Sequence, residues 1–264
     1  MLKYILKLLK IVPIVIIFNL IISVNSSAIE IDNLSQAVNI AGKQRMFTQR
    51  MLKDYVMIGL KNKFSNPKKD LKKVVSSFDD HLISLINFNK KNKTDKSLKK
   101  VKKLWIIVKA SLRRTPKKED ALKIQENLEK LLKESSISTH LFVKQTGKSS
   151  GKIIDISGKQ RMLSQRMAGL YMLKVWGLNN QNITEKMNDA IKTFKKASKI
   201  LMKSSLNTDK ITHLLKKSDR SLMFLEMMSK SKTKFIPSLI YKKSNDILRD
   251  MNKATELYVL QKNK

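Results

Sequence analysis

Two nearly identical stretches constrain what this chain can fold into. "GKQRMFTQRM" occupies residues 42–51 and "GKQRMLSQRM" occupies residues 158–167, a shift of 116 positions. Over the longer ranges 39–55 and 155–171, ten of 17 positions are identical. Repetition at a fixed spacing is typical of duplicated structural units. The sequence therefore predicts two tandem domains, residues 29–146 and 147–264.

Each predicted domain divides into four helices at short stretches rich in Asn, Ser, Pro or Lys. Gly (7) and Pro (4) are scarce among the 264 residues, which favours helix. The expected helices of the first domain are 31–63, 69–89, 96–113 and 118–146. The expected breaks in the second are 178–184, 204–209 and 229–237. The predicted fold is therefore all-α, with two tandem antiparallel four-helix bundles. Residues 146–151 are either a linker or a weak point in one long helix that joins the bundles.

Charge and cysteine content narrow the function classes. The formal net charge is +34, which indicates either a polyanionic partner or a lysine-rich solvated surface. Aromatic residues make up only 6% of the chain, so the sequence shows no base-stacking surface and predicts no nucleic-acid partner. The chain has no cysteine, which excludes disulfides, zinc–thiolate sites and thiol catalysis.

The first predicted helix carries two apolar stripes. At about 100° per residue, Arg45 lies in the middle of one of them, between Leu34, Val38, Leu52 and Val56. The second stripe consists of Ile40, Phe47, Met51, Tyr55 and Ile58, and the polar sector contains Lys43, Arg50, Lys53 and Asp54. A helix with two apolar stripes buries two faces. We expect one face to line its own bundle and the other to meet a partner, in either a homodimer or an intrachain pseudo-dimer of the two repeats.

The arginine in the apolar seam suggests an anion site. A buried charge is unfavourable unless it is paired, and the helical wheel places no carboxylate on that face of either copy. Two such seams would bring Arg45 against Arg161, so an anion is expected between them. Arginine grips a flat oxyanion with two hydrogen bonds. The predicted ligand-binding residues are Arg45, Arg161, Gly42, Gly158, Gln49 and Gln165.

Other polar residues receive weaker interpretations. Arg50 and Arg166 fall on the polar side of their helices and are secondary candidates, for which a structural role is preferred. His81, His140 and His213 have no counterparts at the 116-residue shift. No nucleophile motif, metal-ligand spacing or phosphate loop is present. We therefore expect no catalytic residues, no metal, no cofactor and no enzymatic activity.

The repeated residues resemble a known family. "QAVNIAGKQRMFTQRM" and "KIIDISGKQRMLSQRM" are similar to the N-terminal sensor domain of type IV pili methyl-accepting chemotaxis transducers (PilJ type), which is similar to the sensor of nitrate/nitrite histidine kinases (NarX type). The resemblance implies a four-helix bundle and anion binding at Arg45 and Arg161. Asn39 fits the family pattern "N-x-A-G", whereas the second copy has Asp155, Ile156 and Ser157 before its glycine.

Two functions follow as hypotheses. The first is an exported, periplasmic binding or sensor protein for a small oxyanion such as nitrate or nitrite, presented to a membrane-bound sensor or chemoreceptor. The second is a basic envelope scaffold that binds an anionic polymer or a pilus or chemoreceptor partner. The buried position expected for Arg45 favours the first, because a scaffold does not need it.

The N-terminus predicts export with loss of residues 1–28. Lys3, Lys7 and Lys10 precede an apolar run over 11–24, and the small residues Ser26 and Ala28 fit a cleavage site. The apolar run is shorter than the roughly 20 residues that span a membrane. Mass spectrometry of the protein from envelope extracts should find Ile29 at the N-terminus. An intact Met1 in the membrane fraction would instead show an uncleaved N-terminal anchor.

Overall fold

A computed structural model of the chain describes residues 29–90, 96–178, 180–231 and 235–261. The predicted signal peptide lies outside these residues. The described part is all-α and contains no strand, as the sequence predicts. The helices are α2 (Leu34–Gly59), α3 (Pro67–Lys90), α4 (Lys96–Leu112), α5 (Lys118–Thr146), α6 (Ser149–Val175), α7 (Gln181–Met202), α8 (Asp209–Ser229) and α9 (Pro237–Gln261). Their ends lie within a few residues of the predicted breaks.

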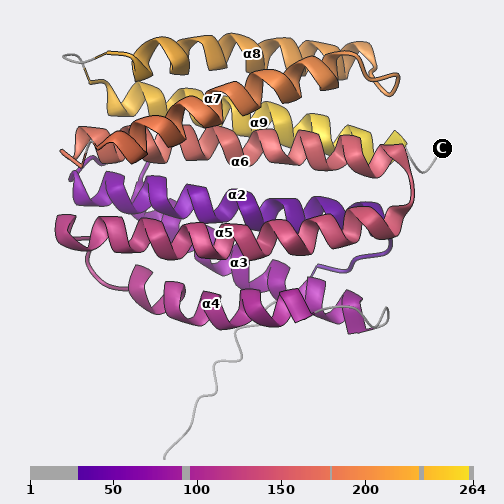
Figure 1. Cartoon of the computed structure of the whole chain (residues 1–264), viewed down its shortest axis with the longest axis horizontal. Coiled ribbons are helices and arrows are strands. Elements are labelled where there is room, and N and C mark those ends of the chain that lie inside the picture. Colours follow the sequence, from indigo (N-terminus) through magenta and orange to yellow (C-terminus); the bar gives the residue numbers. More distant parts are fainter. Residues whose placement is uncertain (1–28, 91–95, 179, 232–234, 262–264) are drawn as a thin grey trace, which may run out of the picture.

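The helices form two groups of four (Figure 1). In the first group, α2 packs on α3 and α5, and α4 covers α5 and α3. In the second, α6 packs on α7 and α9, and α8 covers α9 and α7. Figure 1 shows α2 and α6 side by side in the middle of the molecule, with α4 and α8 at opposite outer edges. This arrangement is consistent with two tandem four-helix bundles, while the domain boundaries remain a prediction from the sequence.

A tight turn joins the two groups. Helix α5 ends at Thr146, and Gly147 adopts a left-handed conformation with φ of 60° before α6 begins at Ser149. A left-handed residue ends an α-helix, and glycine adopts it without steric penalty. The alternative of one long helix through residues 146–151 is therefore wrong.

The two motif helices, α2 and α6, run parallel and in register. A Cβ atom built on Gly42 would lie 4.0 Å from the Cα of Gly158, and one on Gly169 would lie 3.3 Å from Cδ2 of Leu52. Further along, a Cβ on Gly59 would overlap the ring of Trp176. Each contact joins positions separated by about the repeat spacing. The apolar stripe of α2 that contains Arg45 is therefore covered by the other half of the same chain.

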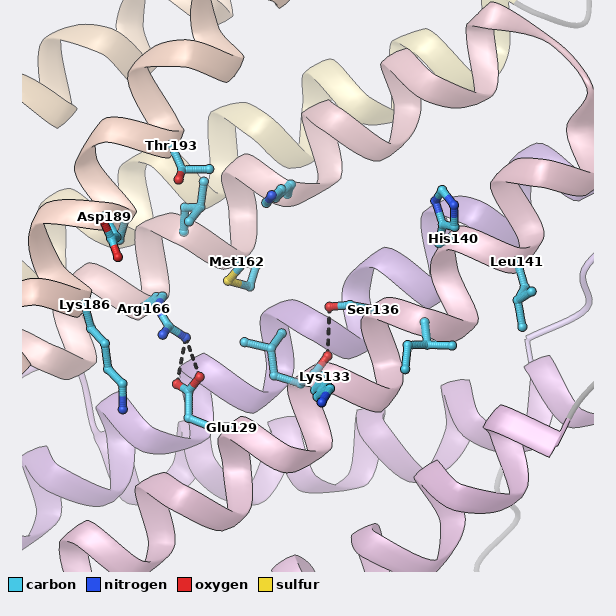
Figure 2. A pocket seen from close by; sticks show the side chains of 15 residues that line it. Glu129, Lys133, Ser136, His140, Leu141, Met162, Arg166, Lys186, Asp189 and Thr193 are labelled. Atoms are coloured by element: carbon cyan, nitrogen blue, oxygen red, sulfur yellow. Dashed lines mark hydrogen bonds and ion pairs between the residues drawn. The ribbon is translucent and has the colours of Figure 1, made fainter. Parts of the chain in front are cut away.

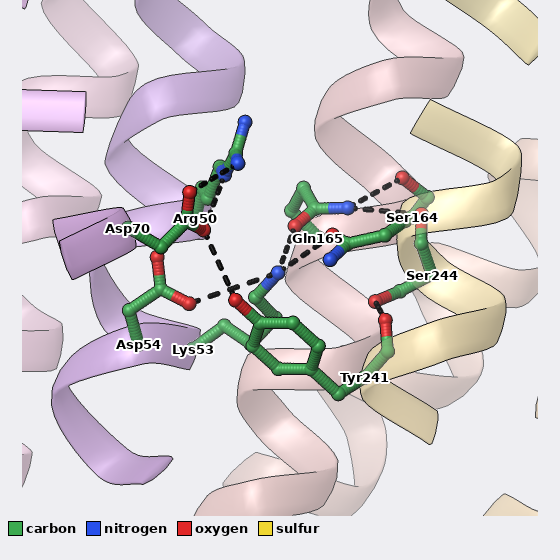
Figure 3. Close-up of polar contacts among 9 residues, drawn as sticks. Arg50, Lys53, Asp54, Asp70, Ser164, Gln165, Tyr241 and Ser244 are labelled. Carbon is green, nitrogen blue, oxygen red and sulfur yellow. Dashed lines mark hydrogen bonds and ion pairs between the residues drawn. The ribbon is translucent and has the colours of Figure 1, made fainter. Parts of the chain in front are cut away.

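The polar sector of α2 differs from the sequence interpretation. Lys53 and Asp54 were placed on the polar side of the helix, but both are fully buried. The placement was wrong because α3 and α9 also pack against α2 and cover that side. Figure 3 shows the resulting polar cluster, which joins residues of α2, α3, α6 and α9.

Lys53 is held by two amide oxygens and an aromatic ring, and its Nζ also lies 3.7 Å from Oδ1 of Asp54. Its Nζ donates to Oε1 of Gln165 and Oδ1 of Asn245, both at 2.8 Å, and lies 3.8 Å from the ring centroid of Tyr241. Burial lowers the pKa of Lys53 to about 8, so the amine remains protonated at neutral pH. The charge is thus accommodated by amide oxygens and an aromatic face, and it ties α2 to α6 and α9.

The pKa values of the two neighbouring carboxyl groups, Asp54 and Asp70, shift in opposite directions. Burial raises the pKa of Asp54 well above its usual value, against the opposing charge of Lys53. Burial acts in the same direction on Asp70, but hydrogen bonds and the charge of Arg50 outweigh it and lower the pKa of Asp70. Nε of Arg50 donates to Oδ2 of Asp70 at 2.8 Å, and the hydroxyl of Tyr241 donates to the same oxygen at 3.1 Å.

Opposite pH dependences are expected for two matched substitutions. Asp54→Asn should gain stability relative to the parent as the pH rises from 4 to 7, because the raised pKa of Asp54 makes the unfolded parent lose this proton before the folded parent does. The gain grows by up to about 1.4 kcal/mol per pH unit. Asp70→Asn should lower the melting temperature at pH 7 and approach the parent as the pH falls through the lowered pKa of Asp70, since a lowered pKa stabilises the fold only above it. If Asp54→Asn melts below the parent at pH 7 but not at pH 4, Asp54 is ionised in the fold.

Candidate functional site

Arg45 and Arg161 lie at the interface of α2 and α6, where the two repeated glycines bring the helices together. Arg45 is 5% exposed and Arg161 is 0% exposed. A Cβ on Gly42 would lie 3.1 Å from Nη2 of Arg161 and 3.4 Å from Nη2 of Arg45. A Cβ on Gly158 would lie 3.0 Å and 3.6 Å from the same two atoms. Both guanidinium groups therefore converge on the space that the glycines leave open.

Each arginine reaches across to the same position of the opposite repeat. Nη2 of Arg45 forms an ion pair with Oδ1 of Asp155 at 2.6 Å and donates to the Asp155 main-chain oxygen at 3.4 Å. Nη1 of Arg161 donates to Oδ1 of Asn39 at 2.9 Å, and Nη2 donates to the Asn39 main-chain oxygen at 3.3 Å. Asn39 and Asp155 correspond at the 116-residue shift, so the contacts are pseudo-symmetric.

The expectation that no carboxylate meets this seam is wrong. On a helical wheel, Asp155 lies about 120° from Arg161 and outside the apolar stripe of its own helix. It nevertheless reaches Arg45, because the parallel packing places it beside the stripe of the opposite helix. The wheel describes one helix at a time and cannot show a partner supplied by the other repeat.

The site carries an excess of positive charge. Burial, followed by the charge of Arg45, lowers the pKa of Arg161 to about 9, which leaves Arg161 charged at neutral pH. Burial and Arg161 also lower the pKa of Lys43, which lies 4.0 Å from Oε1 of Glu256. Burial lowers the pKa of His81 to about 4, so its ring is neutral. The Nε atoms of both arginines are buried and hydrogen-bond to none of the described residues.

The structure separates the predicted glutamines from the arginines. Nε2 of Gln49 donates to Oγ1 of Thr48 at 3.2 Å. Gln165 accepts from Lys53 and donates to the main-chain oxygen of Ser244 at 3.0 Å. Within the described ranges, no hydrogen bond joins either glutamine to a guanidinium group. Gln165 therefore belongs to the Lys53 cluster, one helical turn further along.

Arg50 and Arg166 have structural partners, in keeping with the preferred interpretation. Arg50 binds Asp70 on α3, as described above. Nη1 of Arg166 contacts both carboxylate oxygens of Glu129 on α5, at 2.7 and 2.8 Å. These corresponding positions therefore have different partners, one within the first half of the chain and one between the halves.

Figure 2 shows a groove of about 650 Å³ beside Arg166, between α5, α6 and α7. Its lining includes His140, Lys133 and Lys186 together with the apolar Met162 and Leu163. Glu129 and Arg166 are joined across the groove. The groove does not include Arg45 or Arg161.

Other types of site receive no support from the described residues. They contain no group of three or more His, Asp or Glu side chains that could hold a metal ion. None of their helices is long and apolar enough to cross a membrane. His81 is buried against the ring of Phe47, at 5.0 Å between centroids, and is remote from His140 in the groove.

Sequence reasoning missed two residues whose oxygens accept from the arginines of this site. Asn252 on α9 accepts from Nη1 of Arg161 at 3.1 Å, and no repeat or motif marks it. Asp155 lies inside the repeated stretch, and the sequence shows that it differs from Asn39 at the corresponding position. The sequence does not show that its side chain contacts the opposite helix. The one sequence feature that could have indicated this contact is the replacement of the Asn39 amide by the Asp155 carboxylate at the corresponding position.

Comparison with known proteins identifies the first half of the chain. Residues 30–131 match the family model described as "Type IV pili methyl-accepting chemotaxis transducer N-term", named PilJ. The match contains α2, α3, α4 and the beginning of α5, and thus includes Arg45. No curated protein and no solved structure matches the chain. A PilJ-type N-terminal domain, similar to that of type IV pili methyl-accepting chemotaxis transducers, is therefore found at residues 30–131.

Proposed function

We propose that this chain is a non-enzymatic binding protein of the sensor type that holds one small oxyanion between Arg45 and Arg161. The observation that supports this proposal most directly is the convergence of two buried guanidinium groups over Gly42 and Gly158. Each group has a buried Nε without a partner among the described residues. The PilJ match is in keeping with a sensor role.

An anion would resolve the electrostatic conflict in this interface. Two cations in a water-poor environment repel each other, and the lowered pKa of Arg161 has Arg45 among its causes. A bound oxyanion would attract both groups and accept the two free Nε donors. Planar anions such as nitrate and nitrite suit the planar guanidinium fork. Enclosure by α2 and α6 favours a small anion over a polymer.

The location of the site suggests how binding is transmitted. Arg45 and Arg161 lie on α2 and α6, the two helices through which the halves of the chain meet. An anion between them would draw the helices together and shift one half against the other. Domains of the PilJ type are typically periplasmic parts of membrane chemoreceptors. We therefore propose that the exported chain presents this change to a membrane-bound sensor or chemoreceptor.

Nitrate or nitrite should raise the melting temperature above that in chloride of equal ionic strength. A ligand at 100 times its dissociation constant adds about 2.7 kcal/mol. For a chain of this size that corresponds to a shift of roughly 5 to 10 °C. The measurement is a thermal melt at constant ionic strength, with each anion as its potassium salt.

Arg45→Ala and Arg161→Ala should both abolish this shift. Arg50→Ala is the matched control: it leaves the carboxylate of Asp70 without its arginine and lowers the melting temperature, but it should retain the anion-dependent shift. Equal stabilisation by every anion would indicate general screening of the net charge of +34 and favour the envelope-scaffold alternative. The absence of any anion-specific shift in the parent would contradict the proposed function.

A further inference from the structure

The pseudo-symmetric site departs from symmetry at one side-chain group. Asn39 and Asp155 occupy corresponding positions, and each supplies a side-chain and a main-chain oxygen to the arginine of the opposite repeat. Arg45 therefore faces a carboxylate, whereas Arg161 faces an amide. The second half compensates partly with Asn252, whose neutral oxygen accepts from Arg161.

The charged groups around the site sum to a single positive charge. Arg45 and Arg161 contribute two positive charges, and Asp155 contributes one negative charge. Lys43 and Glu256, which lie 4.0 Å apart, offset each other. His81, which faces the same region from α3, is neutral. A monovalent anion would bring this buried region to neutrality, whereas a divalent anion would leave it with an excess negative charge.

We infer that Asp155 determines the charge of the anion that this site accepts, restricting it to one small monovalent oxyanion. This inference rests on the proposed function. The carboxylate of Asp155 already forms an ion pair with Nη2 of Arg45 at 2.6 Å. It therefore occupies the place where the second negatively charged oxygen of a divalent anion would contact Arg45. Arg161, which has only neutral oxygen partners within hydrogen-bond distance, supplies most of the remaining attraction.

The exchange between Asn and Asp at these two positions allows a matched series in the full-length protein. Asp155→Asn leaves two net positive charges, the parent leaves one, and Asn39→Asp leaves none. The double variant Asn39→Asp/Asp155→Asn restores one charge with the ion pair moved to Arg161. All four proteins are titrated calorimetrically with potassium nitrate and potassium sulfate, at a constant ionic strength set with potassium chloride.

The expected order of nitrate affinity is Asp155→Asn above the parent, and the parent above Asn39→Asp. Each step should be about tenfold, because the removed or added charge lies in direct contact with a buried guanidinium group. Sulfate should bind Asp155→Asn and should not bind the parent. The double variant should prefer nitrate as the parent does, since its total charge is the same.

The outcomes separate this inference from the proposed function. If the parent binds nitrate but Asp155→Asn keeps the same affinity and still rejects sulfate, the role of Asp155 is wrong and the anion site stands. If none of the four proteins binds either anion above the chloride background, the proposed function itself fails. If Asp155→Asn does not fold, Asn39→Asp decides, because unchanged nitrate affinity in that variant would overturn the inference.

Discussion

The parallel, in-register packing of α2 and α6 determines most other features of this structure. It places corresponding positions of the two repeats face to face, and the paired glycines 42 and 158 permit the close approach. It also buries Arg45 and Arg161 together. The four-helix groups on either side then cover the outward faces of α2 and α6 and exclude solvent from the interface.

Two different solutions to buried charge occur along this interface. At one level, Lys53 is held by amide oxygens and an aromatic ring, and burial raises the pKa of the adjacent Asp54. Its polar donors are satisfied, which marks a structural cluster. At the other level, the two arginines retain unpartnered Nε donors and one net positive charge. In the Lys53 cluster the unpartnered buried atoms are the carboxyl oxygens of Asp54, which lie beside a cation, whereas at the arginine site they are cationic donors with excess positive charge around them. This excess charge distinguishes the candidate anion site from the structural cluster.

The sequence predicted the helices and the buried arginines well, because both depend on local periodicity and on the visible repeat. It wrongly predicted that Lys53 and Asp54 are exposed. Their burial depends on α3 and α9, and no local sequence pattern specifies where these helices pack around α2. The contact of Asp155 with Arg45 was missed for a related reason: it arises from the relative direction of two helices. Gln165 was grouped with Arg161, although it contacts Lys53.

The most direct test of the anion site observes the arginine Nε–H groups themselves. In a ¹H–¹⁵N spectrum of arginine side chains, the Nε–H resonances of Arg45 and Arg161 should shift saturably as nitrate is added at constant ionic strength. The resonance of Arg50 should stay in place, because its Nε already donates to Asp70. If Arg45 and Arg161 do not respond, or if all arginines shift linearly with salt, no anion binds between them and the account is contradicted.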